Sequence, residues 1–272
     1  IEDSNGYEEG TQKLTYAGKV LEDNRSLNDY GILNEATLQL SFIPVFTSSA
    51  TFSADENQTA IDTVTATDAN GDTVTFAVSG SELEITSAGV LTFASAPDFE
   101  TKSSYTATVS ASNGINVTTQ AITVNVTDVN EAPVFTSSAT FSADENQTAI
   151  DTVAASDADG DSITFTVSGS ELAITSAGVL TFVSAPDYET KSTYTATVTA
   201  SDGTNTTEQN ITVNVTDVND NSPVFTSDAT FSAAENQTSI GTVTASDADG
   251  ETLSYSLSGT DASSMSLNAS SG

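Results

Sequence analysis

The sequence contains no cysteine, no histidine and no tryptophan. These absences exclude disulfides, zinc sites built from cysteine and histidine, haem ligation by histidine and histidine-based catalytic triads. No run of about 18 apolar residues occurs, so the sequence predicts no membrane-spanning helix. The chain starts at Ile1 and ends at Gly272, partway through a repeat, so we interpret it as a piece of a longer protein.

Positive charge is also scarce, because 5 basic residues face 38 acidic ones and the formal net charge is −33. Such a chain repels nucleic acid and anionic lipid, and it attracts cations or polar surfaces such as sugars. Scattered acidic residues also serve solubility. Solubility alone does not explain why many of the acidic residues recur at fixed positions.

A long phrase occurs three times in the sequence. Pro44–Thr59 returns at Ala132–Thr148 and again at Ser222–Thr238, with a period of 89 to 90 residues. A period of that size indicates tandem domains rather than solenoid units. We therefore predict four parts: a distinct segment at 1–42, repeat 1 at 43–131, repeat 2 at 132–221 and a truncated repeat 3 at 222–272.

Each repeat shows the alternation of apolar and polar residues that is typical of strands with one buried face. In repeat 1 the apolar positions include Val74, Phe76 and Val78, then Tyr105, Ala107, Val109 and Ala111, then Ile122, Val124 and Val126. Turn pairs such as Asn70-Gly71 and Asn113-Gly114 separate them. About seven short strands per repeat predict an all-β chain of tandem Greek-key sandwiches.

Oxygen-bearing side chains are concentrated where repeats 2 and 3 meet. Asp217, Asn219, Asp220 and Asn221 fall within five residues, and no lysine or arginine lies near them. Calcium takes six to eight oxygen ligands from carboxylates, amides and backbone carbonyls. The stretch therefore predicts a calcium site, and its imperfect twin at Thr127–Phe135 predicts another.

The run Asp217-Val-Asn-Asp-Asn221 resembles the D-x-N-D-N linker of the cadherin family, in the form found in bacterial cadherin-like domains. The resemblance extends to that family's Glu at the end of the first strand, its D-x-D, its D-x-E and its A-x-D, and it implies that each calcium site is shared by two successive repeats. The ligands that it implies at the first junction are Glu56, Asp98, Glu100, Asp128, Asn130, Glu131, Asp157, Asp159 and Asp202. Those that it implies at the second junction are Glu145, Asp187, Glu189, Asp217, Asn219, Asp220, Asn221, Asp247 and Asp249.

Several positions depart from the cadherin pattern. Asn70 and Asn113 stand in repeat 1 where repeat 2 has Asp159 and Asp202, and no acidic linker precedes Ile43. We therefore expect the junction at Ser41–Val45 to be independent of calcium. At the first inter-repeat junction Glu131-Ala132 replaces Asp220-Asn221, so we expect weaker binding there.

Residues 1–42 resemble the C-terminal half of ubiquitin, through Ala17-Gly-Lys19, Leu21-Glu-Asp23, Leu27, Asp29-Tyr30 and Glu35–Leu38. The resemblance implies a partial β-grasp fold, with a strand at Lys13–Tyr16, a tight turn at Ala17-Gly18, a helical turn at Leu27–Tyr30 and a last strand at Thr37–Phe42. The first half of that fold is absent from this chain, so we expect the segment to be ordered only when the missing half is supplied.

The ubiquitin-like segment lacks the features that serve ubiquitin signalling. The family's apolar recognition patch falls on the polar Thr15 and Ser41, and no di-glycine tail follows Phe42. Lys19 occupies the place of a lysine used in chain linkage, but one surface lysine carries little weight. We interpret the segment as a structural or docking module.

Together these features predict a non-catalytic, extracellular or cell-surface protein, acting as an adhesin, stalk or filament whose junctions are stiffened by Ca²⁺. Its expected partners are calcium ions, other copies of itself, and cell-surface or polysaccharide ligands. An alternative is a carbohydrate-binding or spacer region of a secreted hydrolase, for which exposed aromatic platforms would be the distinguishing sign. Carboxylate pairs such as Asp98 and Glu100 could perform glycosidase chemistry, but their recurrence beside a linker favours a structural role.

Overall fold

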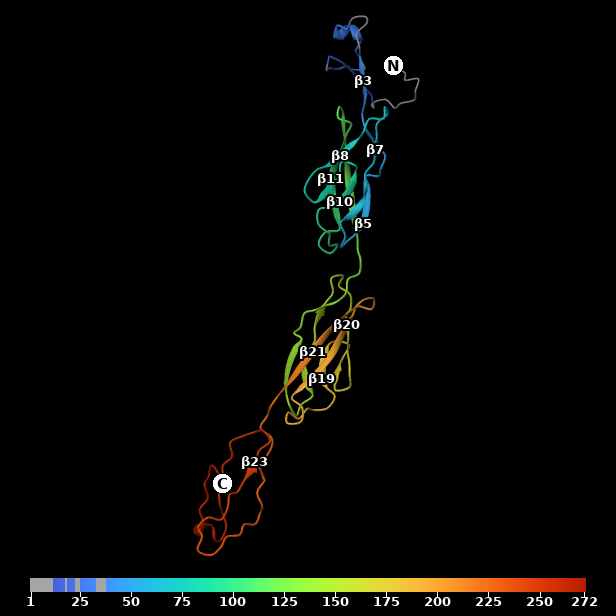
Figure 1. Ribbon diagram of the computed structural model, residues 1–272. Coiled ribbons are helices and arrows are strands. Elements are labelled where there is room, and N and C mark those ends of the chain that lie inside the picture. The colour runs from blue at the N-terminus through green and yellow to red at the C-terminus, as the bar shows by residue number, and fades with distance from the viewer. Residues whose placement is uncertain (1–11, 18, 23–24, 33–37) are drawn as a thin grey trace. The chain divides into compact units, whose positions relative to one another are not determined.

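The computed structural model describes residues 12–17, 19–22, 25–32 and 38–272 of the chain (Figure 1). Two compact units are present, Ile1–Val129 and Asn130–Gly272, and each is described by itself. Apart from two short 3-10 helices, the regular structure of the described residues consists of β-strands, which confirms the predicted fold class. The boundary between the units falls inside the first predicted linker.

The N-terminal segment forms a three-stranded antiparallel sheet of order β2-β1-β3. Its strands are β1 (Gln12–Tyr16), β2 (Lys19–Val20) and β3 (Gln39–Phe42), and the 3-10 helix η1 (Leu27–Tyr30) lies between them in the chain. The strand at Lys13–Tyr16 and the helical turn at Leu27–Tyr30 are thus found where the ubiquitin resemblance implied them. Gly18 of the expected tight turn and the stretch 35–37 lie outside the described residues.

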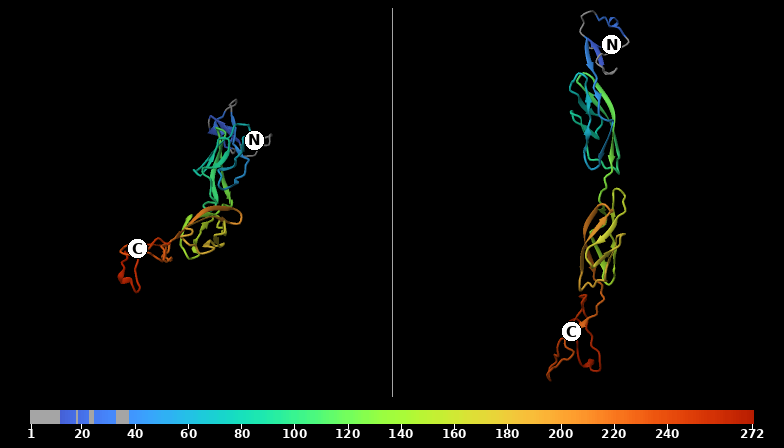
Figure 2. Two further views of the ribbon diagram at one scale, coloured as in Figure 1. Left: turned by 60° about the horizontal axis from the view of Figure 1, so that its bottom comes forward. Right: turned by 90° about the vertical axis from the view of Figure 1, so that its right-hand side faces the viewer.

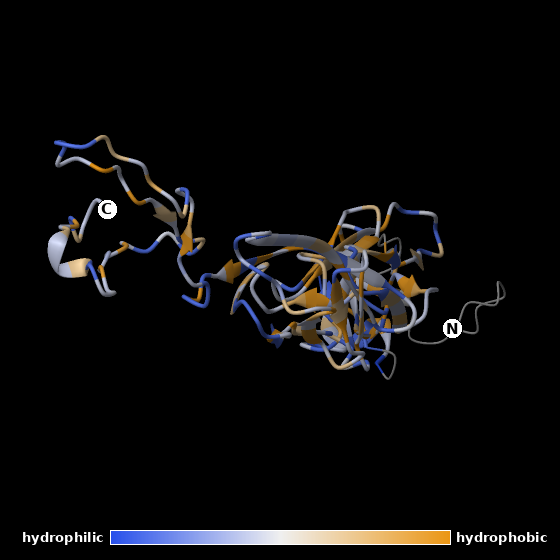
Figure 3. Ribbon diagram, turned by 90° about the horizontal axis from the view of Figure 1, so that it is seen from below, coloured by the Kyte–Doolittle hydropathy of each residue, from blue (hydrophilic) through white to orange (hydrophobic). Residues whose placement is uncertain are grey.

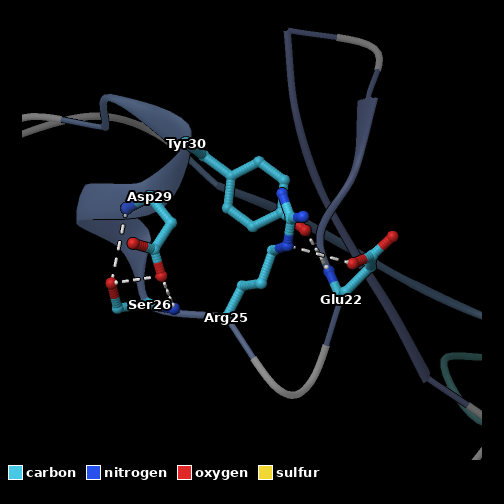
Figure 4. Close-up of polar contacts among 5 residues, drawn as sticks. All are labelled: Glu22, Arg25, Ser26, Asp29 and Tyr30. Atoms are coloured by element: carbon cyan, nitrogen blue, oxygen red, sulfur yellow. Dashed lines mark hydrogen bonds and ion pairs between the residues drawn. The ribbon is translucent and has the colours of Figure 1, made fainter.

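Helix η1 is held by local polar contacts (Figure 4). The Ser26 hydroxyl accepts a hydrogen bond from Asp29 N, and Asp29 Oδ2 accepts one from Ser26 N at 2.8 Å, which is a capping box. The hydrogen bond from the Ser26 hydroxyl is the main cause that lowers the pKa of Asp29. Arg25 pairs with Glu22 at 3.2 Å, and the Tyr30 hydroxyl accepts from Glu22 N at 2.7 Å. These contacts connect Glu22, Arg25 and Ser26 with each other and with the helix.

Repeat 1 folds as a sandwich of short strands. The four-stranded sheet has the order β5-β12-β11-β8, the facing sheet β6-β10-β9, and β4 pairs with β7. The strands are β4 (Val45–Phe46), β5 (Thr51–Asp55), β6 (Ala60–Thr63), β7 (Ala66–Thr67), β8 (Thr75–Val78), β9 (Leu83–Ile85), β10 (Val90–Phe93), β11 (Ser104–Ser112) and β12 (Val117–Thr127). All pairs are antiparallel except β5 with β12, which runs parallel.

The core of repeat 1 draws on both sheets, and buried positions alternate with more exposed ones along β11 and β12. Figure 3 colours the ribbon by the hydropathy of each residue. Ile122, Val124 and Val126 of β12 are buried, as the alternation predicted. They pack with Leu91 and Phe93 of the opposite sheet. This alternation arises because successive side chains of a strand point to opposite faces.

Repeat 2 reproduces the same architecture. Its sheets have the orders β14-β21-β20-β17, β15-β19-β18 and β13-β16, and β14 pairs with β21 in parallel. The strands are β13 (Val134–Phe135), β14 (Thr140–Asp144), β15 (Ala149–Thr152), β16 (Ala155–Ser156), β17 (Thr164–Val167), β18 (Leu172–Ile174), β19 (Val179–Phe182), β20 (Thr193–Ser201) and β21 (Thr206–Thr216).

Repeat 3 contains little regular structure (Figure 2). Its elements are β22 (Val224–Phe225), β23 (Ala245–Ser246) and the 3-10 helix η2 (Ala262–Ser264). Residues 230–234 match the first strand of the other repeats in sequence, but they form no strand. In repeats 1 and 2 this strand pairs in parallel with the last strand of the sandwich.

Candidate metal centres

A buried glutamate anchors the linker end of each complete repeat. Glu56 follows β5, is 4% exposed, and accepts backbone hydrogen bonds from Phe99 N and Val129 N, each at 2.9 Å. Glu145 follows β14, is 4% exposed, and accepts from Tyr188 N at 2.8 Å and Val218 N at 2.9 Å. Each carboxylate therefore ties the D-x-E loop to the following linker.

A second glutamate and an aspartate join each anchor. Carboxylate oxygens of Glu56, Glu100 and Asp128 lie within 4.8 Å of one another, and those of Glu145, Glu189 and Asp217 do the same. The two groups occupy equivalent positions in repeats 1 and 2. Oxygens at these separations are close enough for one cation to contact all three, at the 2.3 to 2.6 Å that calcium favours.

At the second junction, within unit Asn130–Gly272, the carboxylates continue in an overlapping series. Carboxylate oxygens of Glu189, Asp220 and Asp249 also lie within 4.8 Å of one another, and so do those of Asp247, Asp249 and Glu251. Glu189 and Asp249 thus each belong to two groups. The series links the linker end of repeat 2 to the D-x-D loop of repeat 3.

The linker amide of Asn221 lies among these carboxylates. Its Nδ2 donates to Asp249 Oδ1 at 2.8 Å, to Asp220 Oδ1 at 2.9 Å and to Glu189 Oε2 at 3.2 Å. Asp249 Oδ2 accepts from the backbone N–H groups of Asp220 and Asn221, at 3.1 and 2.7 Å. Hydrogen-bond donors therefore offset part of the crowded negative charge.

The pKa values reflect this crowding. Desolvation is the main cause that raises the pKa of Glu189 above its ordinary value, and Glu145 and Asp249 add repulsion. Desolvation likewise raises the pKa of Asp217, with further repulsion from Asp249, Glu145 and Asp220. The side-chain hydrogen bond from Asn221 is the main cause that lowers the pKa of Asp249. Nearby carboxylates disfavour one another's charged forms unless donors or cations compensate.

Repeat 2 contributes a second set of predicted ligands, which belong to the first junction. Asp202 Oδ1 accepts from Thr204 N and Asn205 N, both at 2.6 Å, and Asp202 Oδ2 accepts from Asn130 Nδ2 at 2.9 Å. Desolvation raises the pKa of Asp202, but these hydrogen bonds outweigh it and lower the pKa overall. Asp159 Oδ2 accepts from Glu131 N at 2.9 Å.

Two oxygens beside Asp202 lack such partners. Asp157 Oδ2 and Asp159 Oδ1 are buried and have no hydrogen-bond donor. A buried carboxylate oxygen without a donor is costly, and a cation is one way to satisfy it.

Asp98, Asp187 and Asn219 are among the predicted ligands that belong to none of these clusters of carboxylates. Asp98 and Asp187 each turn both oxygens toward their own loop, where they accept from the backbone N–H and the hydroxyl of Thr101 and Thr190. The Asn219 side chain is exposed. The structure therefore assigns the two aspartates a turn-capping contact in addition to any role with a cation.

Sequence reasoning missed three residues that take part in these junctions. Asn146 Nδ2 donates to Asp220 Oδ2 at 2.6 Å, and Asn205 Nδ2 donates to Asn130 O at 2.9 Å. Glu251 joins the group of Asp247 and Asp249. Repetition was an available signal, because Glu-Asn recurs at 56–57, 145–146 and 235–236, and an acidic residue recurs at 72, 161 and 251.

Comparison with known proteins supports the fold. The sequence model of the ubiquitin family matches residues 1–44, and the model of the bacterial Ig domain matches residues 130–216. Cadherin EGF LAG seven-pass G-type receptor 1 of Homo sapiens is 36% identical over 146 residues, or 47% of this chain and 5% of that protein. The chain thus matches only a small part of this relative's length.

Solved cadherin structures share the fold over most of the chain. Mouse cadherin-23 EC22-24 matches with a TM-score of 0.56 and 25% identity, over 85% of this chain and 86% of that one. Protocadherin gammaB7 EC3-6, solved as a cis-dimer, matches with a TM-score of 0.56 and 26% identity, over 84% and 65% of the two chains. The chain is a series of cadherin-like, adhesion-type β-sandwich repeats that follows a ubiquitin-like segment. Among the described residues, no helix has the length and apolar character needed to cross a membrane.

Proposed function

We propose that this chain is a non-catalytic part of an extracellular or cell-surface protein, an adhesin, stalk or filament whose junctions between repeats are stiffened by Ca²⁺. The observation that carries the proposal is the overlapping series of carboxylates at the second junction, in which Glu189 and Asp249 each belong to two groups. Hard oxygen ligands in this number suit calcium better than a transition metal.

The absence of nearby positive charge supports a cation as the missing partner. The only basic residues after Arg25 are Lys102 and Lys191. Each pairs with a glutamate of its own repeat, Glu82 or Glu171, and lies over a tyrosine ring. Neither lysine is therefore available to neutralise the junctions. The buried, unpartnered oxygens of Asp157 and Asp159 favour a cation at the first junction as well.

The carbohydrate-binding alternative receives less support. Among the described aromatic residues, only Phe225 and Phe231 are exposed, and both lie in repeat 3. Tyr105 and Tyr194 are covered on one face by a lysine and contact Phe93 and Phe182. An aromatic platform for a sugar needs a free, flat ring, and the complete repeats present none among these residues.

Calorimetric titration of the chelator-treated chain with CaCl₂ tests the proposal. We expect calcium to bind, and the double variant Asp217→Asn, Asp249→Asn to lose the component assigned to the second junction. A matched control removes two charges from exposed strand positions, Glu84→Gln and Glu208→Gln, and should bind as the parent does. Equal binding by both double variants, or no binding by the parent at millimolar calcium, would contradict the proposal.

A further inference from the structure

The junction between the ubiquitin-like segment and repeat 1 is held by asparagine amides. Asn113 lies in the turn between β11 and β12, and its Nδ2 donates to Phe42 O at 3.0 Å and to Asp68 Oδ2 at 2.8 Å. Its Oδ1 accepts from Ile115 N at 3.0 Å and Asn116 N at 2.7 Å. The orientation of the amide is determined, because two partners are pure acceptors and two are pure donors.

A second amide holds the same carbonyl. Asn116 is 6% exposed, and its Nδ2 donates to Phe42 O at 2.7 Å and to Ser41 Oγ at 3.1 Å. Ser41 and Phe42 end strand β3, and Ser41 is 5% exposed. The last strand of the ubiquitin-like segment is therefore fixed to repeat 1 by direct protein contacts.

The equivalent turn of repeat 2 makes the same backbone hydrogen bonds, but it presents an acceptor where repeat 1 presents a donor. Asp202 Oδ1 accepts from the N–H groups two and three residues on, as Asn113 Oδ1 does, and Asn205 Nδ2 holds a linker carbonyl, as Asn116 Nδ2 does. Where Asn113 presents an NH₂ group, however, Asp202 presents a carboxylate oxygen. A donor in repeat 1 is thus replaced by an acceptor in repeat 2.

The neighbouring aspartates differ accordingly. In repeat 1, Asp68 Oδ2 receives the Asn113 amide, and Asp72 Oδ2 receives the Asn70 amide at 2.9 Å. In repeat 2, Asp157 Oδ2 and Asp159 Oδ1 are buried with no donor. The loops of repeat 1 are satisfied internally, whereas those of repeat 2 require positive charge from outside.

We propose that the Asn113 amide takes the place that a divalent cation fills at the other junctions, and so forms a metal-independent joint between the ubiquitin-like segment and repeat 1. The comparison with the other junctions rests on the proposed function. The joint recognises a main-chain carbonyl and a small hydroxyl, so it fixes the strand end through backbone rather than through a large apolar surface. The choice of asparagine instead of aspartate at this position thus makes the joint independent of calcium, unlike the other junctions.

Hydrogen exchange on the full chain, in calcium and in chelator, tests the proposal. In the parent, protection at residues 39–44 should be equal in both conditions. Asn113→Asp places a second carboxylate against Asp68, so protection there should fall about tenfold or more in chelator and return when calcium is added. Asn113→Ser removes the donor without adding charge, so it should loosen residues 39–44 in both conditions.

Several outcomes would overturn the inference. The first is protection of residues 39–44 that depends on calcium in the parent. The second is unchanged protection in both variants. The third is an Asn113→Asp variant in which calcium does not restore the protection of residues 39–44 although β11 and β12 stay protected. If Asn113→Asp unfolds repeat 1 in chelator, Asn113→Ser decides: parent-like protection of residues 39–44 in that variant also overturns the inference. Exchange at residues 217–224 reports separately on the proposed function. Exchange there that does not respond to calcium would contradict calcium binding at the second junction. The Asn113→Ser result would then still test whether Asn113 holds the joint between the ubiquitin-like segment and repeat 1.

Discussion

At the scale of single residues, Glu56 and Glu145 combine two roles. Each is almost fully buried and accepts hydrogen bonds from two backbone N–H groups. Each also contributes an oxygen to a cluster of three carboxylates. Burial of a charged carboxylate is costly unless charge-assisted hydrogen bonds or a cation compensate for it. The backbone bonds hold the glutamate in place before any ion binds.

We expect Glu145→Gln to destabilise repeat 2 even in chelator. The glutamine NH₂ group would face either Tyr188 N–H or Val218 N–H, donor against donor, and the expected loss is about 1 to 3 kcal/mol. Denaturant unfolding of the full chain in chelator measures it. The control Glu171→Gln breaks an exposed pair with Lys191 and should cost under about 1 kcal/mol. Equal losses in the two variants would contradict the anchoring role of Glu145.

The raised pKa values of Glu189 and Asp217 predict an unusual pH response. Their folded-state pKa values lie above the unfolded ones, so the folded chain binds these protons first and gains stability as pH falls through the folded values. The pKa of Asp249 is lowered, so its contribution is present above the ordinary value of 3.8 and is lost below it. In chelator, the melting temperature should therefore rise as the pH falls from 7 through the raised pKa values of Glu189 and Asp217, and it should fall again at pH values below the ordinary 3.8.

Calcium should reverse the first part of this profile, because protons and calcium compete for the same oxygens. Thermal melts across pH, with and without calcium, give the comparison. The double variant Glu189→Gln, Asp217→Asn should flatten the rise in chelator. If the melting temperature in chelator falls steadily as the pH is lowered from 7, the repulsion between carboxylates at this junction has no influence on stability.

At the scale of elements, the first and last strands of each complete repeat pair in parallel, and repeat 3 differs from them. Phe52 and Phe141 are 7% exposed on strands that pair with β12 and β21, whereas their counterpart Phe231 is 39% exposed. The chain ends at Gly272, whose Cβ position would meet Val243 O as those of Gly89 and Gly178 would meet Val64 O and Val153 O. Gly272 is thus the counterpart of the residue before β10 and β19.

Adding the missing strands should complete repeat 3. If residues 179–216, which form β19 to β21, are appended after Gly272, residues 230–234 should become a strand and Phe231 should be buried. Hydrogen exchange at 230–234 measures the gain in protection. The same extension with its copy of Val213 changed to Asp is the control, because Val213 pairs with Phe141 in repeat 2. Equal protection in both extensions would contradict this account of the missing strand.

The ubiquitin-like segment also exposes large apolar side chains. Leu40 is 48% exposed and Leu27 is 46% exposed. The hydrogen bonds described between this segment and repeat 1 involve the end of β3, at Ser41 and Phe42. That the rest of the segment is ordered only when the missing half is supplied therefore stays a prediction.

The sequence predicted the elements better than the contacts between them. Alternation and repetition identified the strands and most of the carboxylate groups, because both signals are local or periodic. The parallel pairing of β5 with β12 joins residues about 70 positions apart, and no local pattern indicates it. The roles of Asn113 and Asn116 depend in the same way on a turn that meets a distant strand. The capping by Asp98 could have been predicted, because Thr101 follows at the spacing of a polar turn.

At the scale of the whole molecule, each complete repeat has a core of its own, and none of the predicted ligands belongs to either core. Metal should therefore act on the junctions rather than on the fold of each repeat. The metal-independent joint at Asn113 implies that the ubiquitin-like segment keeps its attachment to repeat 1 in chelator, while the junctions that follow loosen.

We expect calcium to increase the mean dimension of the full chain in X-ray scattering, and chelator to reduce that dimension and lower the melting temperature. The triple variant Asp128→Ala, Asp157→Ala, Asp159→Ala should reproduce part of the chelator effect in the presence of calcium, because the second junction stays intact. Its circular dichroism should match that of the parent, because none of the three side chains belongs to a core.

A matched control removes three exposed acidic residues that belong to no predicted site: Glu84, Glu208 and Asp228. It reduces the net negative charge by the same amount as the triple variant, so any effect of overall repulsion appears equally in both. If calcium stiffens the junctions, only the triple variant should shorten and melt earlier in calcium. A ligand that favours one arrangement of the repeats must shift the population toward that arrangement. Identical dimensions and melting temperatures in calcium and in chelator would therefore contradict a stiffening role for calcium, and the acidic residues would then serve only solubility.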